Sequence, residues 1–340
     1  MVSEHAYVDL ETENLFPWYR EAISDLTARL AAQPGVAGLV LLGGLAAGGR
    51  RQFMDRYSDL DMSVFVSVDL PDDVLRLAYP EMIAAAQPLL PTWLPNFKFM
   101  VPDGALPVDW PVEINIHQQL LEYEELPHVS WDAGKCDAYE NTGEILHDPT
   151  GRIGALVEAK LKAARPGLTN HLYRLLSSGR VVVEIMVRQC LDRGIYHAAH
   201  DMMNDVLHNV MVGWYAVNGR FAPVHKWRVV SLRSLPWTPA DAAVRYSDLL
   251  LVKAHDADDV KRRMAGLLEM LDELQEQCAR TWPEWPADPY VTAVHHTFTD
   301  RQLRRVTTAD ELDAVQGLSQ EQKMRVAEWN WHNWRFGAGA

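Results

Sequence analysis

Two aspartates one residue apart, Asp59 and Asp61, are the residues of this sequence whose type and spacing best suggest chemistry. They begin an apolar stretch, DLDMSVFVSV (59–68), whose alternation and β-branched and aromatic content predict a strand. Side chains alternate along a strand, so both carboxylates are expected on one face. Like charges at this range repel unless a cation lies between them, and Mg²⁺ prefers carboxylate, water and phosphate oxygens. The pair therefore predicts a magnesium site.

A third carboxylate is expected from a later strand, VEINIHQ (112–118). Its apolar residues share one face, and Glu113, Asn115 and His117 share the other, as in the wall of a polar site. Asp109 is a competing candidate, but the proline two residues after it makes that stretch a poor inner strand. Glu113 is therefore the expected third acidic residue, as a metal ligand or as a general base.

A glycine pair, Gly43-Gly44, follows an apolar strand predicted at 36–42. Glycines permit close approach of the backbone to a ligand, and backbone N–H groups there can bind phosphate oxygens. The stretch matches neither the P-loop nor the dinucleotide-binding pattern. Ser58 and Arg50, the latter beside Arg51, are further candidates for contact with phosphate, although two arginines on a loop are also typical of a solvent-exposed segment.

The order of strand, Gly-Gly, Asp-x-Asp strand and later Glu strand resembles the nucleotidyltransferase superfamily of the polymerase-β type. With a fourteen-residue spacer between Gly44 and Asp59 and a helical region after HDPTG (147–151), it looks most like the aminoglycoside nucleotidyltransferases of the streptomycin 6-adenylyltransferase type. The resemblance covers about residues 36–150. Two positions depart from it: Gly44 stands where serine is common, and Glu113 stands where aspartate is usual.

This resemblance implies an enzyme that transfers a nucleoside monophosphate, AMP from ATP in the simplest case, to a hydroxyl of a small molecule such as an aminoglycoside-like antibiotic, with release of pyrophosphate. Asp59, Asp61 and Glu113 would be the catalytic and metal-binding residues for two Mg²⁺ ions. Gly43, Gly44, Ser58, Arg50 and Lys226 would bind ATP or another nucleoside triphosphate. The alternatives are an enzyme that modifies RNA or protein, and a silent nucleotide-binding regulator, which the glycine at position 44 would favour.

The pattern along the chain predicts an α+β fold: an N-terminal α/β domain with a mixed sheet, followed by an all-helical bundle domain. The expected domains are a nucleotidyltransferase catalytic domain at 1–150, a helical domain at 151–281 that covers substrate or nucleotide, and a linker with a C-terminal helical tail at 282–340. Helices are expected at 15–32, 71–90, 152–164, 195–218 and 258–280, where apolar residues recur at helical spacing.

Composition narrows the function classes. The formal net charge is −14, which disfavours a large nucleic-acid surface and suits a cationic acceptor. Three widely spaced cysteines indicate a reducing compartment without a disulfide framework, and no stretch reaches the ~18 apolar residues of a membrane helix. The N-terminus has no secretory pattern, so a cytoplasmic location is expected. His197, His200 and His208 have spacing that zinc can use, but no accompanying motif supports such a site.

Overall fold

The protein is described by a computed structural model that covers residues 12–46, 58–67, 87–88, 96–101 and 112–287, together with residues 311 and 314. The chain divides into two compact units between Lys162 and Ala163. The first contains a mixed sheet and the second is helical, so the prediction of an α+β fold with a mixed sheet followed by a helical domain is confirmed.

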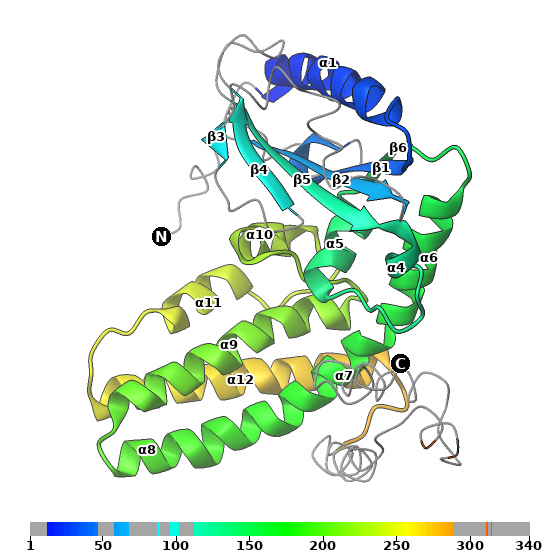
Figure 1. Ribbon diagram of the computed structural model, residues 1–340. Coiled ribbons are helices and arrows are strands. Elements are labelled where there is room, and N and C mark those ends of the chain that lie inside the picture. The colour runs from blue at the N-terminus through cyan, green and yellow to red at the C-terminus, as the bar shows by residue number, and fades with distance from the viewer. Residues whose placement is uncertain are drawn as a thin grey trace. The chain divides into compact units, whose positions relative to one another are not determined.

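Among the described residues of the first unit, six strands form one sheet in the order β3-β4-β5-β2-β1-β6 (Figure 1). The neighbours β2 and β5 are parallel, and every other pair is antiparallel. The strand bounds are β1 Val36–Leu42, β2 Leu60–Val66, β3 Gln87–Pro88, β4 Asn96–Val101, β5 Val112–Leu120 and β6 Glu144–His147. The parallel pair lies in the middle of the sheet and carries the predicted acidic residues.

One face of this sheet is covered by helix α1, Thr12–Ala31 (Figure 1). The apolar side of the helix faces alternate residues of β1, β2 and β5. Each fully buried side chain of this kind contributes about 1.5–3 kcal/mol to the stability of the fold through the hydrophobic effect. The apolar side includes Tyr19, Ile23, Leu26 and Leu30, and the strand residues include Leu39, Leu41, Leu60, Met62, Val64, Ile114 and Ile116. The intervening polar residues must therefore lie on the opposite face.

The opposite face of the sheet is covered by helices at one end, near Phe65 of β2 and Gly38 of β1. These two residues are partners in the β1–β2 register. Tyr139 of α5, Ala133–Asn141, makes an edge contact with Phe65 at a centroid distance of 6.3 Å. A Cβ built on Gly38 would lie 2.2 Å from Cγ1 of Ile153 in α6, Arg152–Ala164, so only glycine permits this approach. Asp61 lies four residues before Phe65 and is only half-buried, so the covered end does not include the carboxylates.

Most of the expected strands are confirmed. The strands predicted at 36–42, 59–68 and 112–118 correspond to β1, β2 and β5, although β2 begins at Leu60 and Asp59 lies just before it. The helix predicted at 71–90 is wrong at Gln87 and Pro88, which pair with β4, and its other residues lie outside the described part of the chain. The short strand β6, the helix α5 and the one-turn helix α4, Leu121–Glu124, were not expected.

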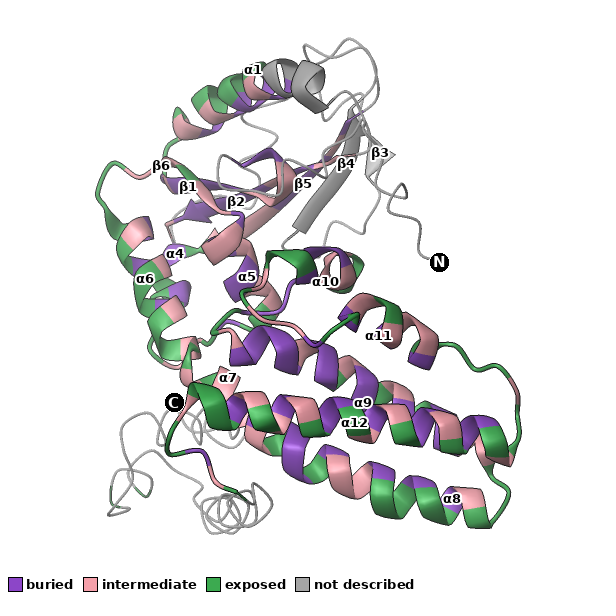
Figure 2. Ribbon diagram, turned by 180° about the vertical axis from the view of Figure 1, so that it is seen from behind, coloured by how far each residue is buried: buried purple, intermediate pink, exposed green. Residues whose placement is uncertain are grey.

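The helical unit begins within the last turn of α6 and is built around the long helices α9, Tyr196–Val217, and α12, Ala257–Thr281. Both helices expose one side and bury the other (Figure 2). The remaining elements are α7 Pro166–Arg174, the π-helical segments Leu175–Gly179 and Val182–Val187, α8 Arg188–Asp192, α10 His225–Ser231, the 3₁₀ turn Leu232–Ser234 and α11 Ala242–Leu250. The predictions of helices at 152–164, 195–218 and 258–280 are confirmed to within about three residues.

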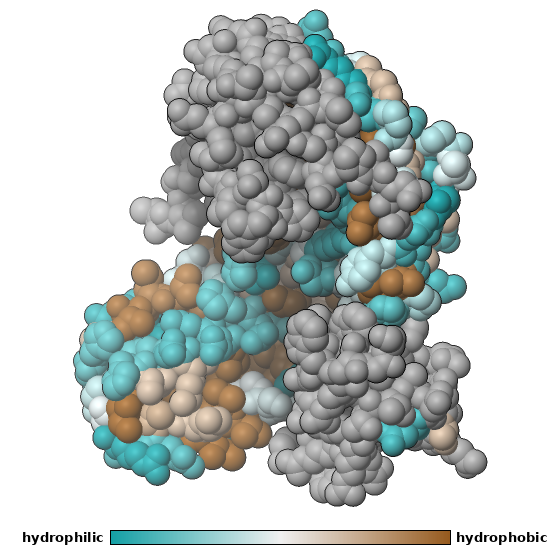
Figure 3. All heavy atoms as spheres, in the orientation of Figure 1, coloured by the Kyte–Doolittle hydropathy of each residue, from teal (hydrophilic) through white to brown (hydrophobic). Residues whose placement is uncertain are grey.

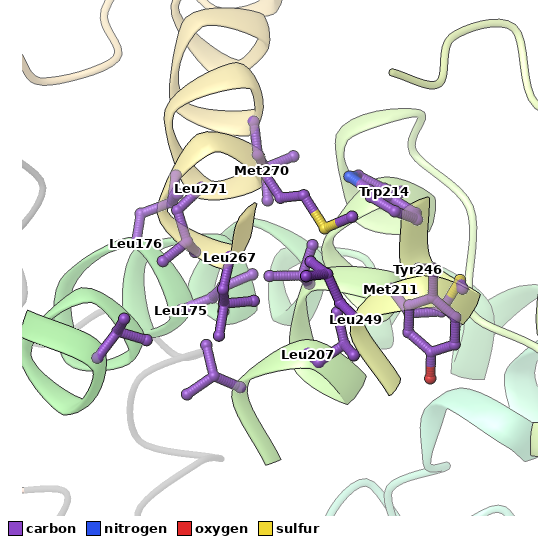
Figure 4. Packing of buried hydrophobic residues seen from close by; sticks show 14 of the residues in the cluster. Leu175, Leu176, Leu207, Met211, Trp214, Tyr246, Leu249, Leu267, Met270 and Leu271 are labelled. Carbon is purple, nitrogen blue, oxygen red and sulfur yellow. The ribbon is translucent and has the colours of Figure 1, made fainter. Parts of the chain in front are cut away.

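The core of the helical unit is formed by leucines, methionines and aromatic residues from several helices (Figure 4). The stripe that the sequence places on α12 is buried along its whole length, from Val260 to Cys278. Trp214 of α9 is fully buried, and the neighbouring Gly213 is so closely packed that a Cβ there would lie 2.8 Å from methyl carbons of Leu175 and Leu274. The core is therefore close-packed at Gly213 as well as around its large side chains.

The tryptophan-rich stretch after α12 packs against the same core. Trp285 is 7% exposed, its ring stacks on Tyr173 at a centroid distance of 4.3 Å, and its indole N–H donates to Oε1 of Gln275 over 3.0 Å. The described residues at 282–287 thus belong to the packed helical unit. Of the expected C-terminal helical tail, Glu311 and Ala314 are helical, and the other residues after 287 lie outside the described part.

The outer face of the helical unit carries hydrophilic and hydrophobic residues side by side (Figure 3). Val244, Leu250 and Leu251 are among its exposed large hydrophobic residues. Within the described ranges, no helix combines the length and apolar character that crossing a membrane requires. Cys136, Cys190 and Cys278 are buried free thiols, as the absence of a disulfide framework predicted.

Candidate active site

The parallel pairing of β2 with β5 sets the geometry of the candidate site. Asp61 is the register partner of Asn115, and Leu60 is the partner of Ile114. Because Leu60 and Ile114 point into the core under α1, Asp61 and Asn115 must both point to the opposite face. The same alternation places Glu113 on that face, and Asp59 reaches it from the residues just before β2.

The side-chain amide of Asn115 joins the three predicted carboxylates. Its Nδ2 donates to Oδ2 of Asp59 over 2.9 Å, to Oδ1 of Asp61 over 2.9 Å and to Oε1 of Glu113 over 3.2 Å. Three acidic residues from two segments more than fifty residues apart therefore converge on one atom. These contacts bring Glu113 together with the two aspartates, and its role as ligand or base stays a prediction.

The donor set of this cluster fits Mg²⁺ in its chemistry. Magnesium is held by hard oxygen ligands, commonly one or more carboxylates with phosphate oxygens and water, and this cluster offers three carboxylates. An amide NH₂ has two hydrogens for three acceptor residues, so Asn115 alone cannot donate fully to all three. Within the described ranges, no group of three or more His, Cys, Asp or Glu is arranged to hold a metal ion.

The first residue of the glycine pair, Gly43, lies against one of these carboxylates, that of Asp61. Leu42, the last residue of β1, is the register partner of Asp61, and the chain then enters a 3₁₀ turn, Gly43–Leu45. Gly43 has φ of +80°, which side-chain-bearing residues rarely adopt, and a Cβ built on it would lie 3.3 Å from Oδ2 of Asp61. The turn thus brings its backbone to the edge of the acidic cluster, where the sequence predicted a phosphate contact.

The structure describes only some of the other residues that were predicted to bind nucleotide. Ser58 directly precedes Asp59, and its carbonyl accepts a hydrogen bond from the Tyr19 hydroxyl over 2.9 Å, which fixes the chain as it enters the site. Arg50 and the competing Asp109 lie outside the described residues. Lys226 is exposed on α10 of the helical unit, with its Nζ 5.6 Å from the centroid of the Trp227 ring. The nucleotide-binding roles of all these residues stay predictions.

Farther along the same sheet face, a second polar network connects the strands to α5. Nε2 of Gln119 donates to the Ser63 hydroxyl over 3.0 Å and to the Tyr139 hydroxyl over 2.9 Å, and Oε1 of Gln119 accepts from Lys135 over 2.8 Å. Lys135 also forms an ion pair with Glu124 at 2.9 Å. Burial raises the pKa of Tyr139, which keeps its hydroxyl protonated. This network holds α5 on the sheet beside the acidic cluster.

The histidines of α9 do not gather into a site. His200 is buried and its Nδ1 is bonded to Nη1 of Arg263 at 2.8 Å, whereas Nδ1 of His208 is bonded to the Tyr246 hydroxyl at 2.8 Å. His197 is exposed on the same helix. His200 is therefore a buried partner of an arginine, whereas His197 lies on the helix surface.

Asn115 was not among the site residues predicted from the sequence. The alternation of VEINIHQ placed it on the polar face with Glu113, and this alternation was the signal that could have identified it. Its contact with both aspartates depends on the parallel pairing of β2 with β5 and on their register, and neither is visible in a strand pattern alone.

Comparison with known proteins adds one structural likeness. No family model matches the sequence, and no curated protein matches it. Among the solved structures that match is the crystal structure of a nucleotidyltransferase-like protein from Exiguobacterium sibiricum 255-15. It is 14% identical, the match covers 94% of this chain and 89% of that chain, and the TM-score is 0.39.

Proposed function

We propose that this protein is a nucleotidyltransferase that transfers a nucleoside monophosphate, AMP from ATP in the simplest case, to a hydroxyl group of a small molecule. The observation that carries the proposal is the convergence of Asp59, Asp61 and Glu113 within 3.2 Å of one amide nitrogen, beside the close-packed turn at Gly43. A cluster of three carboxylates next to a glycine turn suits a triphosphate that arrives with its cations.

In the proposed reaction, the acceptor oxygen forms a bond to the α-phosphorus while the bond from that phosphorus to the bridging oxygen breaks, and pyrophosphate leaves. The acceptor proton passes to a base, for which Glu113 is the candidate. Asp59 and Asp61 would hold the divalent cations, and the backbone at Gly43 and Gly44 would position the phosphates. Bound Mg²⁺ would supply neutralisation of the charge that develops on the phosphoryl oxygens.

The proposed acceptor is a small, cationic compound with a free hydroxyl, such as an aminoglycoside-like antibiotic. The net charge of −14 supports a cationic acceptor over a polyanion such as RNA, because a polyanion would be repelled by the protein's overall field. Two Mg²⁺ ions and ATP are the proposed cofactors and co-substrate. The proposed location is the cytoplasm, for which the three free thiols are the support.

The test is a pyrophosphate-release assay of the full-length protein with Mg²⁺ and ATP, run against a panel of hydroxyl-bearing antibiotics and sugars. Asp59→Asn and Asp61→Asn should each lower turnover by about 100-fold or more, as expected for loss of a group that positions transition-state charge. Glu144→Gln is the matched control, because Glu144 is an acidic residue of the same sheet that pairs with Arg20 at 2.8 Å. Full turnover in the Asp59→Asn, Asp61→Asn double variant would contradict the proposal.

The two roles considered for Glu113 differ in how the rate responds to Mg²⁺. If Glu113 removes the acceptor proton, Glu113→Gln should lower the maximal rate even at saturating Mg²⁺, whereas a ligand role should raise the Mg²⁺ concentration needed for half-maximal rate. Tight ATP binding without pyrophosphate release across the whole panel would favour the silent regulator. Transfer of labelled nucleotide to RNA or protein in a lysate would favour the macromolecular acceptor.

A further inference from the structure

A second group of titratable and basic side chains gathers on the helical unit, away from the acidic cluster in the sequence and in its chemistry. His208 of α9 is half-buried, and its Nδ1 lies 2.8 Å from the hydroxyl of Tyr246 in α11. The ring of His208 also meets the ring of His225, an exposed residue of α10, edge-on at a centroid distance of 6.0 Å. Three helices therefore meet at His208.

Arg228 of α10 is held in place and still has donors to offer. Its Nε donates to the Pro223 carbonyl over 2.8 Å, and its own carbonyl accepts from the Tyr215 hydroxyl over 2.6 Å. Within the described part of the chain, no acceptor and no carboxylate pairs with its two terminal nitrogens. The guanidinium thus presents a fixed pair of N–H donors, which matches the oxygens of a phosphoryl group.

The positive charge of Arg228 acts on side chains of α9 and α11. Burial lowers the pKa of His208, and His225 and Arg228 lower it further, against an opposing effect of Asp205. Burial raises the pKa of Tyr246, whereas Arg228 lowers it. Arg228 is therefore close enough to both side chains for its charge to matter, and it lies with them and His225 in one group.

Helix α7 contributes a further histidine that is affected by the same arginine. Burial lowers the pKa of His171, the hydrogen bond of its Nε2 with the Asn209 carbonyl at 3.0 Å opposes this, and Arg174 and Arg228 lower the pKa further. Positive charge at this place thus disfavours the protonated form of a nearby imidazole. An anion would have the opposite effect, because opposite charges favour one another's ionised forms.

His208 can supply another donor. Because burial keeps Tyr246 protonated, its hydroxyl can donate to Nδ1 of His208, and the proton of the neutral imidazole then lies on Nε2. Among the described residues, Nε2 of His208 has no hydrogen-bond partner. Its N–H group is therefore available to an anion together with the guanidinium of Arg228.

We infer that Arg228, His208 and His225 form a binding site for a phosphoryl group on the helical unit. The inference does not rest on the proposed function, because none of these residues belongs to the acidic cluster and the site needs no metal. A phosphoryl group offers more charge and more acceptor oxygens than a carboxylate, which suits one guanidinium with two imidazoles. Inorganic phosphate and the tail of a nucleoside triphosphate share this chemistry.

The experiment measures binding of radiolabelled inorganic phosphate to the full-length protein by equilibrium dialysis, in EDTA and at constant ionic strength. Arg228→Gln should weaken binding by about 10-fold or more, and His208→Gln and His225→Gln by about 3-fold each, because hydrogen bonds to charged groups are the stronger ones. Arg228→Lys should keep part of the affinity, because lysine retains the charge without the planar fork. Equal losses in Arg228→Lys and Arg228→Gln would overturn the inference.

Arg188→Gln is the matched control, because Arg188 is an exposed arginine of α8 and its replacement changes the net charge by the same amount. It should keep the phosphate affinity of the wild type. If it weakens binding as much as Arg228→Gln does, the attraction is a property of the net charge and the inference is overturned. If Arg228→Gln does not fold, as judged by circular dichroism, the two histidine variants decide.

Competition in EDTA identifies the source of the phosphoryl group. A site for the triphosphate tail should release labelled phosphate at lower concentrations of ATP or pyrophosphate than of unlabelled phosphate, whereas a site for a single phosphoryl group should not. Wild-type binding no greater than in the presence of excess sulfate and chloride would overturn both forms of the inference.

The double variant Asp59→Asn, Asp61→Asn separates this inference from the proposed function. It should lose nucleotidyl transfer and bind inorganic phosphate like the wild type. Loss of phosphate binding in this variant would overturn the inference and leave the proposed function in place. Full turnover together with normal phosphate binding would do the reverse.

Discussion

Gly43 lies so close to Asp61 that a Cβ built on the glycine would be 3.3 Å from Oδ2 of the aspartate. The two residues are brought together by the β1–β2 register, in which Leu42 is the partner of Asp61. Gly43 also has φ of +80°, so both its backbone conformation and its surroundings favour glycine. The turn after β1 and the acidic cluster are therefore one local structure, and a change in either should affect the other.

Gly43→Ala tests this dependence. The positive φ should cost about 1 kcal/mol of stability, and the added methyl group should displace the Asp61 carboxylate by a few tenths of an ångström. Because small displacements at a reacting centre lower rates strongly, we expect turnover to fall by about 10- to 100-fold. Initial-rate kinetics and urea unfolding measure the two effects separately.

Gly151→Ala is the control for backbone strain. Gly151 has φ of +74°, and a Cβ on it would meet nothing within 4 Å. It should lose a similar amount of stability and keep its turnover. Equal turnover in the two variants would show that the contact between Gly43 and Asp61 does not matter for activity.

The strands of the first unit were predictable because their patterns are local. VAGLVLL is a continuous apolar run of strand length, and VEINIHQ alternates apolar and polar residues, so its buried face follows from that alternation. β6 and α5 were not predictable in the same way. β6 is a four-residue edge strand, and α5 has almost no apolar face along its sequence AGKCDAYEN, so both depend on contacts with β1 and Phe65.

The candidate site was only partly predictable for a related reason. Asp59, Asp61 and Glu113 follow from residue type and strand alternation. The role of Asn115 follows only from the pairing of two strands that are separated by about fifty residues, and pairing is a property of the whole sheet. The same holds for His200: helical spacing places it on α9, but its burial against Arg263 depends on how α12 packs there.

Gly213→Ala should destabilise the helical unit. Alanine favours a helix over glycine, but the added Cβ would lie 2.8 Å from methyl carbons of both Leu175 and Leu274. Overpacking of this kind typically costs about 1–3 kcal/mol, which should exceed the gain in helix propensity. The urea midpoint of the full-length chain measures the result.

Gly167→Ala in α7 provides the comparison, because a Cβ at Gly167 would meet nothing within 4 Å. It should be neutral or should gain up to about 1 kcal/mol. A Gly213→Ala protein as stable as the wild type would mean that the core relaxes around the extra methyl group.

Trp285→Ala should show that the stretch after α12 belongs to the helical unit. The change removes a ring that stacks on Tyr173 at 4.3 Å and a hydrogen bond to Gln275, and we expect a loss of about 3 kcal/mol. Gln275→Ala removes this hydrogen bond and the one that its Nε2 donates to the Pro286 carbonyl, and it leaves the stacked rings, so it should cost about 1–2 kcal/mol. If both variants lose the same small amount in urea unfolding, Trp285 does not anchor the segment.

His200 should make the stability of the helical unit fall in acid. Burial lowers the pKa of His200, and the positive charge of Arg263 lowers it further, against an opposing effect of Asp259. The folded state therefore binds a proton less readily than the unfolded state, in which a histidine has a pKa of about 6.5. Stability is fully present above that pH and is lost as the pH falls from about 6.5 toward the lower pKa of the folded state.

His200→Gln should flatten this decline, because the glutamine amide oxygen can still accept the hydrogen bond from Arg263 but does not titrate. The drop in urea midpoint between pH 8 and pH 5 should therefore be smaller in the variant than in the wild type. Burial also lowers the pKa of His171 and His208, so a shallower decline should remain in the variant. His197→Gln, at an exposed position of the same helix, should keep the wild-type slope. A full slope in His200→Gln would assign the acid sensitivity to the other histidines.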